Sequence, residues 1–140
     1  MRIESIETFL RDPVALVRVR TDDGAEGWGQ VSTWSADITV SVLHKLVADR
    51  FLGHPVDGFE ARVSDVIMEL NKYTGTFVCR AVAGVDTALW DLRAKAEGNN
   101  IATALGAASR RVRIYGSDMK RDTTPEQQID RLLPWQDDMG

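Results

Sequence analysis

The chain has 140 residues, of which 44% are hydrophobic and 27% charged, and 17 basic residues stand against 21 acidic ones. This length accommodates one ordinary domain but excludes a closed (β/α)₈ barrel, which needs at least about 200 residues. A formal net charge of −4 suits neither phosphate backbones nor anionic lipid, so we expect no nucleic-acid partner and no membrane partner. Without an apolar spanning segment or signal-type N-terminus, a cytoplasmic location is expected.

Residues that build hydrolase and zinc sites are scarce. Cys79 is the single cysteine, so it cannot form an internal disulfide. The two histidines are His44, on the solvent side of a predicted helix, and His54, beside a proline in a loop. We expect both histidines to be solvated, and we expect no nucleophile and no metal ligand among these three residues.

Three strand-like runs open the chain. Residues 3–10 are rich in β-forming side chains, and residues 14–20 end in alternating apolar and basic side chains. The Asp23-Gly24 step that follows is a strong hairpin signal. The third run, residues 26–31, is short and rich in glycine, which indicates close approach of another backbone or a bulge. The pattern predicts a three-stranded antiparallel meander.

The hydrophobic period then changes to that of helices. Ser35 is the expected N-cap of a first helix that ends near Gly53. The spacing of Asp57 and Glu60 predicts a capping box at the start of a second helix. A third helix, from about residue 78 to residue 97, is the most apolar of the three. Further on, Thr124 is predicted to cap a helix with proline at its first position.

The third helix carries two apolar strips at helical spacing. One strip has large side chains and the other only small ones. The large strip comprises Val78, Val82, Val85, Leu89, Leu92 and Ala96, and the small strip comprises Ala81, Gly84 and Ala88. Small side chains let another element approach closely, so we expect neighbours on two sides of the helix. Asp86 and Asp91 point about 140° apart on the helix, and we expect structural ion pairs for them.

The stretch from Ala81 to Gly98, AVAGVDTALWDLRAKAEG, resembles the signature helix of the enolase superfamily, and most closely that of the mandelate racemase and muconate lactonizing enzyme group. The segments 21–30 and 112–117 agree with that family in order and spacing. The resemblance implies an α+β fold, in which the three-stranded meander and a helical bundle form an enolase-type capping domain over residues 1–110. Residues 111–140 would then form the first β/α unit of a TIM-type barrel that is incomplete in this chain.

The resemblance also implies a reaction, namely Mg²⁺-dependent abstraction of a proton α to a carboxylate. Racemases, cycloisomerases and sugar-acid dehydratases of this group act on acid sugars or related small carboxylates. Their metal ligands and acid/base residues lie on later barrel strands, so no catalytic residue and no Mg²⁺ ligand is assigned within this chain. We therefore expect the 140 residues alone to be inactive, with the remaining barrel domain as partner and a homo-oligomer as a further possibility.

An alternative is a free-standing, non-catalytic α+β module that binds other molecules and reuses the capping fold. The residues beyond the first barrel strand distinguish this module from the enzyme interpretation, since the family's catalytic side chains belong there.

Capping domains of this family contribute loops that select the substrate. The loop between the first two strands is reduced here to residues 11–13, so specificity is expected to depend on residues 31–35. Trp34 is the first candidate substrate contact, and the alternative is that it packs on the meander or staples the helix start. Tyr73 and Thr74, before the third helix, and Ser117, after the first barrel strand, are further candidates. Their alternative role is that of ordinary loop residues.

Overall fold

A computed structural model of the chain describes residues 1–73, 75–107 and 122–135. The chain divides into two compact units, Met1–Gly106 and Ala107–Gly140, and each is described by itself. The first barrel strand, expected just before Ser117, lies outside the described residues.

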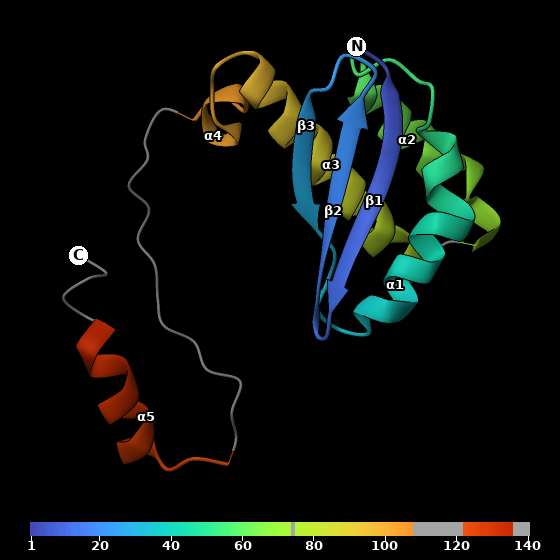
Figure 1. Cartoon of the computed structure of the whole chain (residues 1–140). Coiled ribbons are helices and arrows are strands. Elements are labelled where there is room, and N and C mark those ends of the chain that lie inside the picture. Colours follow the sequence, from blue (N-terminus) through green and yellow to red (C-terminus); the bar gives the residue numbers. More distant parts are fainter. Residues whose placement is uncertain (74, 108–121, 136–140) are drawn as a thin grey trace. The chain divides into compact units, whose positions relative to one another are not determined.

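The first unit opens with an antiparallel sheet of strands β1 (Ile3–Arg11), β2 (Val14–Thr21) and β3 (Glu26–Gln30), in the order β1-β2-β3 (Figure 1). The sheet confirms the predicted meander. Val17 lies opposite Thr8 of β1 and Gly29 of β3. On the face that Val17 shares with its neighbours along β2, the side chains are fully buried, because the helices of the unit cover that face.

Helices follow the sheet. They are α1 (Ala36–Val42), the π-helical segment η1 (Leu43–Val47), the 3₁₀ turn η2 (Ala48–Arg50), α2 (Phe59–Glu69), the 3₁₀ turn η3 (Asn71–Tyr73), α3 (Thr76–Ala96) and α4 (Ile101–Ala104). Helix α3 packs directly on β2 and β3, and α1 and α2 pack against α3 (Figure 1). The predicted first helix is therefore divided into three segments of different helical type.

The three predicted helix caps have different outcomes. Ser35 is the N-cap residue of α1 as predicted, but its backbone is left-handed (φ 53°, ψ 56°) and its side chain makes no capping hydrogen bond. Gly58, also left-handed at φ 75°, takes the N-cap position of α2, so no capping box forms with Asp57. A capping side chain needs an extended backbone at the cap. Thr124 has that conformation and accepts from the Gln127 N–H, which confirms the predicted cap of α5 (Pro125–Leu132) in the second unit.

Two glycines of β3 bring that strand into direct contact with α3. A Cβ atom added to Gly27 would lie 2.1 Å from the carbonyl oxygen of Ala88, and one added to Gly29 would lie 2.2 Å from that of Gly84. Gly84 and Ala88 belong to the small strip of the third helix. The close approach predicted from the glycines and the neighbour predicted for the small strip are thus the same contact.

The large strip of α3 lies in the hydrophobic core. Its first five members are buried as predicted, whereas Ala96, in the last turn, is exposed. Phe59 of α2 and Phe51, just after η2, are fully buried against the same core, and Phe59 makes an edge contact with Trp90 at 5.2 Å between ring centroids. Ile38 and Ile67, at predicted apolar positions of the first two helices, are 46% and 39% exposed.

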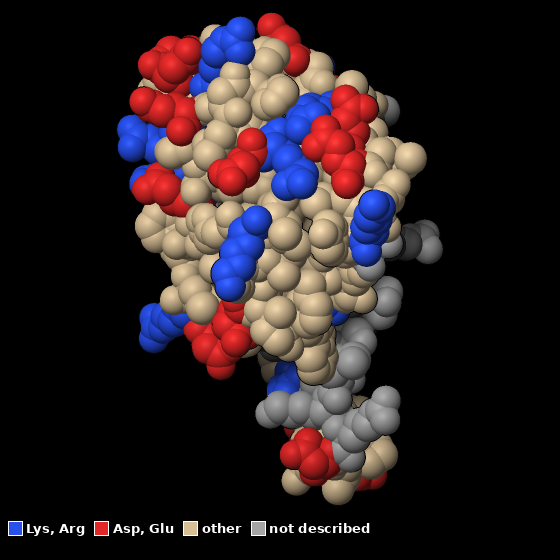
Figure 2. All heavy atoms as spheres, turned by 90° about the vertical axis from the view of Figure 1, so that its right-hand side faces the viewer, with Lys and Arg blue, Asp and Glu red and all other residues tan. Residues whose placement is uncertain are grey.

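The chain has 17 basic and 21 acidic residues, and side chains of both kinds lie on its surface (Figure 2). Figure 2 shows acidic and basic side chains interleaved on the α1 and α2 side, next to a largely uncharged area. In the part of the chain that the structure describes, no helix is both long and apolar enough to cross a bilayer.

Candidate functional site

Two loops lie at the same end of the sheet. The β1–β2 turn is formed by Asp12 and Pro13, and the loop 31–35 leaves the sheet beside it, since the Val31 N–H donates to the Ala15 carbonyl at 3.1 Å. Helix α3 reaches this loop from its second turn, where Arg80 Nη1 donates to the Trp34 carbonyl at 2.9 Å. We call the β1–β2 turn, the loop 31–35 and the α3 residues 76–80 together the loop end of the first unit.

At the loop end, the side chain of Trp34 is exposed, whereas its backbone is fixed by hydrogen bonds. The Trp34 N–H donates to Ser32 Oγ at 3.3 Å, and the carbonyl accepts from Arg80. The indole is nevertheless 70% exposed. This exposure contradicts the alternative that Trp34 packs on the meander or staples the start of α1. A large aromatic side chain left in solvent on a fixed loop is available for a binding partner.

The structure describes one of the other three predicted site residues, Tyr73, Thr74 and Ser117. Tyr73 ends η3, donates its backbone N–H to the Leu70 carbonyl at 2.8 Å, and is 63% exposed. Thr74 and Ser117 lie outside the described residues. The structure thus describes two of the four candidates, and both have exposed aromatic side chains.

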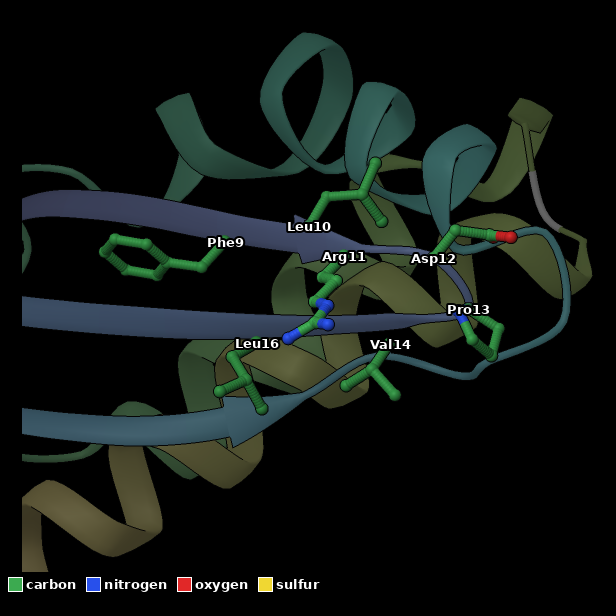
Figure 3. Close-up of a pocket in the computed structure, with 7 residues that line it drawn as sticks. All are labelled: Phe9, Leu10, Arg11, Asp12, Pro13, Val14 and Leu16. Carbon is green, nitrogen blue, oxygen red and sulfur yellow. The ribbon is translucent and has the colours of Figure 1, made fainter.

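The β1–β2 hairpin carries an open apolar groove that sequence patterns did not predict. Its lining residues are Phe9, Leu10, Arg11, Asp12, Pro13, Val14 and Leu16 (Figure 3). Phe9 and Leu16 are opposite each other in the register, and they are 45% and 38% exposed. Figure 3 shows Arg11 reaching across β2 toward Leu16, whereas Leu10 points to the side of α1. The short turn predicted between these strands is confirmed.

On the same outer face of the sheet, Arg18 is enclosed by two rings and two carboxylates. Its guanidinium lies 5.2 Å from the ring centroid of Phe9 and 5.4 Å from that of Trp28. It also forms ion pairs with Glu7 at 2.9 Å and with Glu26 at 3.6 Å. One cation thus joins all three strands, which indicates a structural rather than a chemical role for Arg18.

The two aspartates of α3 have separate surroundings. Asp91 accepts from the Trp28 backbone N–H at 2.8 Å and from Lys95 Nζ at 2.6 Å, which confirms the expected ion pair. Asp86 forms no ion pair with the described residues, contrary to expectation. Burial raises the pKa of Asp86, and the negative charge of Glu60 raises it further. The carboxylates therefore do not act as a pair.

The described residues do not fit a metal ion. In residues 1–73, 75–107 and 122–135, no three side chains of histidine, cysteine, aspartate or glutamate lie together as a ligand set. His44 is exposed, with Nε2 2.8 Å from Thr8 Oγ1, so it has a neutral hydroxyl partner rather than a carboxylate. Cys79 is exposed on α3.

Comparison with curated proteins gives relatives of different activity. D-galactonate dehydratase of Xanthomonas axonopodis pv. citri (strain 306) is 32% identical over 122 residues, which are 82% of this chain and 31% of the relative. The o-succinylbenzoate synthase of Bacillus subtilis (strain 168) is 30% identical over 112 residues, 77% of this chain and 30% of the relative. The chain thus spans less than a third of the length of these two enzymes.

Solved structures share the fold over most of the chain. A putative racemase from Roseobacter denitrificans is 47% identical, with a TM-score of 0.88 over 98% of this chain and 37% of its own. A mandelate racemase/muconate lactonizing protein from Paracoccus denitrificans PD1222, complexed with magnesium, is 28% identical, with a TM-score of 0.71 over 79% of this chain and 31% of its own.

Neither set of relatives favours the free-standing module, because each named relative is a much longer protein. The family model for the N-terminal domain of mandelate racemase / muconate lactonizing enzymes matches residues 3–106, which is nearly the whole first unit. With the α+β architecture described above, this chain belongs to the mandelate racemase and muconate lactonizing enzyme family of the enolase superfamily and contains its N-terminal domain.

Proposed function

We propose that this chain serves as the capping domain of a Mg²⁺-dependent enzyme that removes the proton α to a carboxylate of a small acid. Residues 1–110 form the cap and residues 111–140 the first β/α unit of the barrel. Acid sugars are the favoured substrates, since D-galactonate dehydratases are among the relatives. The metal and the acid/base groups belong to the barrel, and the structure of a Paracoccus relative with magnesium supports that metal.

The proposal rests on one observation, namely that the loop 31–35 exposes the side chain of Trp34. The loop leaves the sheet beside the β1–β2 turn, which contributes almost no loop of its own. Trp34 is the largest exposed side chain at the loop end. In this account, Trp34 contacts the part of the substrate remote from the reacting carbon. A contact that is equally strong in the ground state and the transition state lowers KM and leaves kcat unchanged.

The experiment joins this cap to a barrel from a relative. Residues 1–106 of this chain replace the matching segment of the Roseobacter denitrificans protein, which is 47% identical to it. Exchange of the α-proton with solvent deuterium is followed by NMR for a panel of acid sugars and other carboxylates, with and without MgCl₂. The unaltered Roseobacter protein and the 140-residue chain alone are the controls.

We expect Mg²⁺-dependent exchange with the chimera and none with the chain alone. In the chimera, Trp34→Ala should raise KM about tenfold and leave kcat within about twofold, because the lost contact is made equally in the ground and transition states. A folded but inactive chimera beside an active Roseobacter protein would exclude the capping role. Exchange by the chain alone would instead place the reaction in this polypeptide.

A further inference from the structure

Arg80 links α3 to the loop that carries Trp34. The two residues are 46 positions apart, and the Arg80 Nη1 donates to the Trp34 carbonyl at 2.9 Å. The guanidinium also lies 5.7 Å from the ring centroid of Phe77, one turn earlier on α3. Arg80 is half-buried, and its guanidinium contacts both the ring and the loop.

The other backbone groups around Trp34 form hydrogen bonds with residues of the loop and of α1. Ser32 Oγ accepts from the Trp34 N–H. The Ser35 carbonyl accepts from both the N–H and the hydroxyl of Thr39, at 3.1 Å and 3.2 Å. Ser35 itself has a left-handed backbone at φ 53°, which a side chain of this kind adopts rarely and which surrounding contacts must maintain.

From these contacts we infer that Arg80 is a positioning residue for Trp34, and that it fixes the direction in which the indole leaves the loop. Among these hydrogen bonds at Trp34 and Ser35, the one from Arg80 reaches outside the loop and α1, whereas the others are local. It involves a charged donor, so it is stronger than a hydrogen bond between neutral groups. Without it, the Trp34 carbonyl would lose its link to α3, and the loop 31–35 would contact that helix only at its buried start, where Val31 packs beside Gly84.

The effect of Arg80 on substrate binding rests on the proposed function. A fixed indole presents a flat apolar face and one N–H donor, which matches the C–H face and a hydroxyl of an acid sugar. A mobile indole would bind the same ligand less well, because ordering it consumes binding free energy. Arg80 would thereby affect substrate binding without touching the substrate.

The first test concerns the loop in the chain itself. Backbone ¹⁵N order parameters of residues 32–35 are measured for the unaltered chain, Arg80→Met and Arg80→Lys, with Arg20→Met as the control. Arg20 is exposed and lies opposite Glu26, away from the loop end. We expect Arg80→Met to lower the order parameters from about 0.85 to about 0.6 or less. Lysine should restore part of the loss, and Arg20→Met should change nothing. Unchanged order parameters in Arg80→Met overturn the inference.

The second test asks whether Arg80 affects KM through Trp34. In the chimera, Arg80→Met should raise KM in the same direction as Trp34→Ala, with kcat within about twofold. In the Trp34→Ala background it should add nothing, because a residue acting through Trp34 has no effect once the indole is gone. Additive effects on KM would overturn the inference. If Trp34→Ala leaves KM unchanged, the proposed role of the loop fails, while the order parameters still decide whether Arg80 holds it.

Discussion

Gly29 and Gly84 meet backbone to backbone, so that a Cβ atom on Gly29 would lie 2.2 Å from the Gly84 carbonyl oxygen. The same added atom would lie 2.9 Å from the Ala88 amide nitrogen. No side chain fits at these distances, and the obstructing atoms belong to the backbone of α3. The position of β3 on α3, and hence the point where the loop 31–35 begins, depends on this contact.

Gly29→Ala should therefore destabilise the fold by about 3 kcal/mol or more, because overpacking against a helix backbone forces the strand and the helix apart. Chemical denaturation monitored by circular dichroism measures this change. Gly75→Ala is the matched control, since Gly75 has an extended backbone at φ 164° and no atom within 4 Å of its added Cβ. Equal stability of the two variants would contradict the proposed close contact.

Asp91 fastens the edge strand β3 to α3 by accepting the Trp28 N–H at 2.8 Å. Asp91→Ala should reduce the free energy of unfolding by about 1–3 kcal/mol, since it leaves a strand N–H without its acceptor. Asp91→Asn should lose less, because an amide oxygen still accepts. The control is Lys95→Met, which removes only an exposed pair within the helix and should change stability by less than about 0.5 kcal/mol. A Lys95→Met loss as large as that of Asp91→Ala would assign the effect to the ion pair instead.

Asp86 should make the fold less stable as the pH rises. Burial, and then the charge of Glu60, raise the pKa of Asp86 above the ordinary value of 3.8, so the folded state binds the proton more tightly than the unfolded state. The cost is absent below about pH 3.8 and complete once the pH exceeds the raised pKa. Arg93, which pairs with Glu60, moderates the repulsion.

Asp86→Asn should consequently stabilise the fold at pH 7 by less than about 1 kcal/mol, since the carboxyl is partly exposed. This difference in stability should disappear below about pH 3.8. Denaturation midpoints of both proteins from pH 3 to pH 7 give the difference directly. A variant that is less stable at neutral pH would mean that the Asp86 carboxylate makes a favourable interaction instead.

Trp34→Ala should leave the stability of the first unit within about 0.5 kcal/mol of its original value, because the indole is 70% exposed. Thermal unfolding of the 140-residue chain is the measurement. Trp90→Ala is the contrasting variant, because that ring packs on Phe59 and under Arg93. A loss of 2 kcal/mol or more for Trp34→Ala, roughly the value of a buried large side chain, would show that Trp34 supports the fold.

The sequence predicted the features that depend on periodic patterns. The alternation in β2, the two strips of α3 and the glycines of β3 all led to the observed sheet and packing. Ser35 lies at the predicted N-cap position without a capping hydrogen bond, and the capping box at Asp57 was predicted wrongly. A polar residue before an apolar run does not reveal whether the backbone at the cap is left-handed. The contact between Arg80 and Trp34 was not predictable, since it joins residues brought together only by the fold.

We propose that the loop 31–35 selects the substrate of a barrel enzyme. The direct measurement is the ratio of kcat/KM values for a panel of acid sugars, determined for the chimera, the Roseobacter denitrificans protein, and the chimera whose residues 31–35 carry the Roseobacter sequence. We predict that the chimera differs in preference from the Roseobacter protein and that the five-residue exchange restores most of the Roseobacter preference. An unchanged preference after that exchange would contradict the claim and assign selectivity to the barrel.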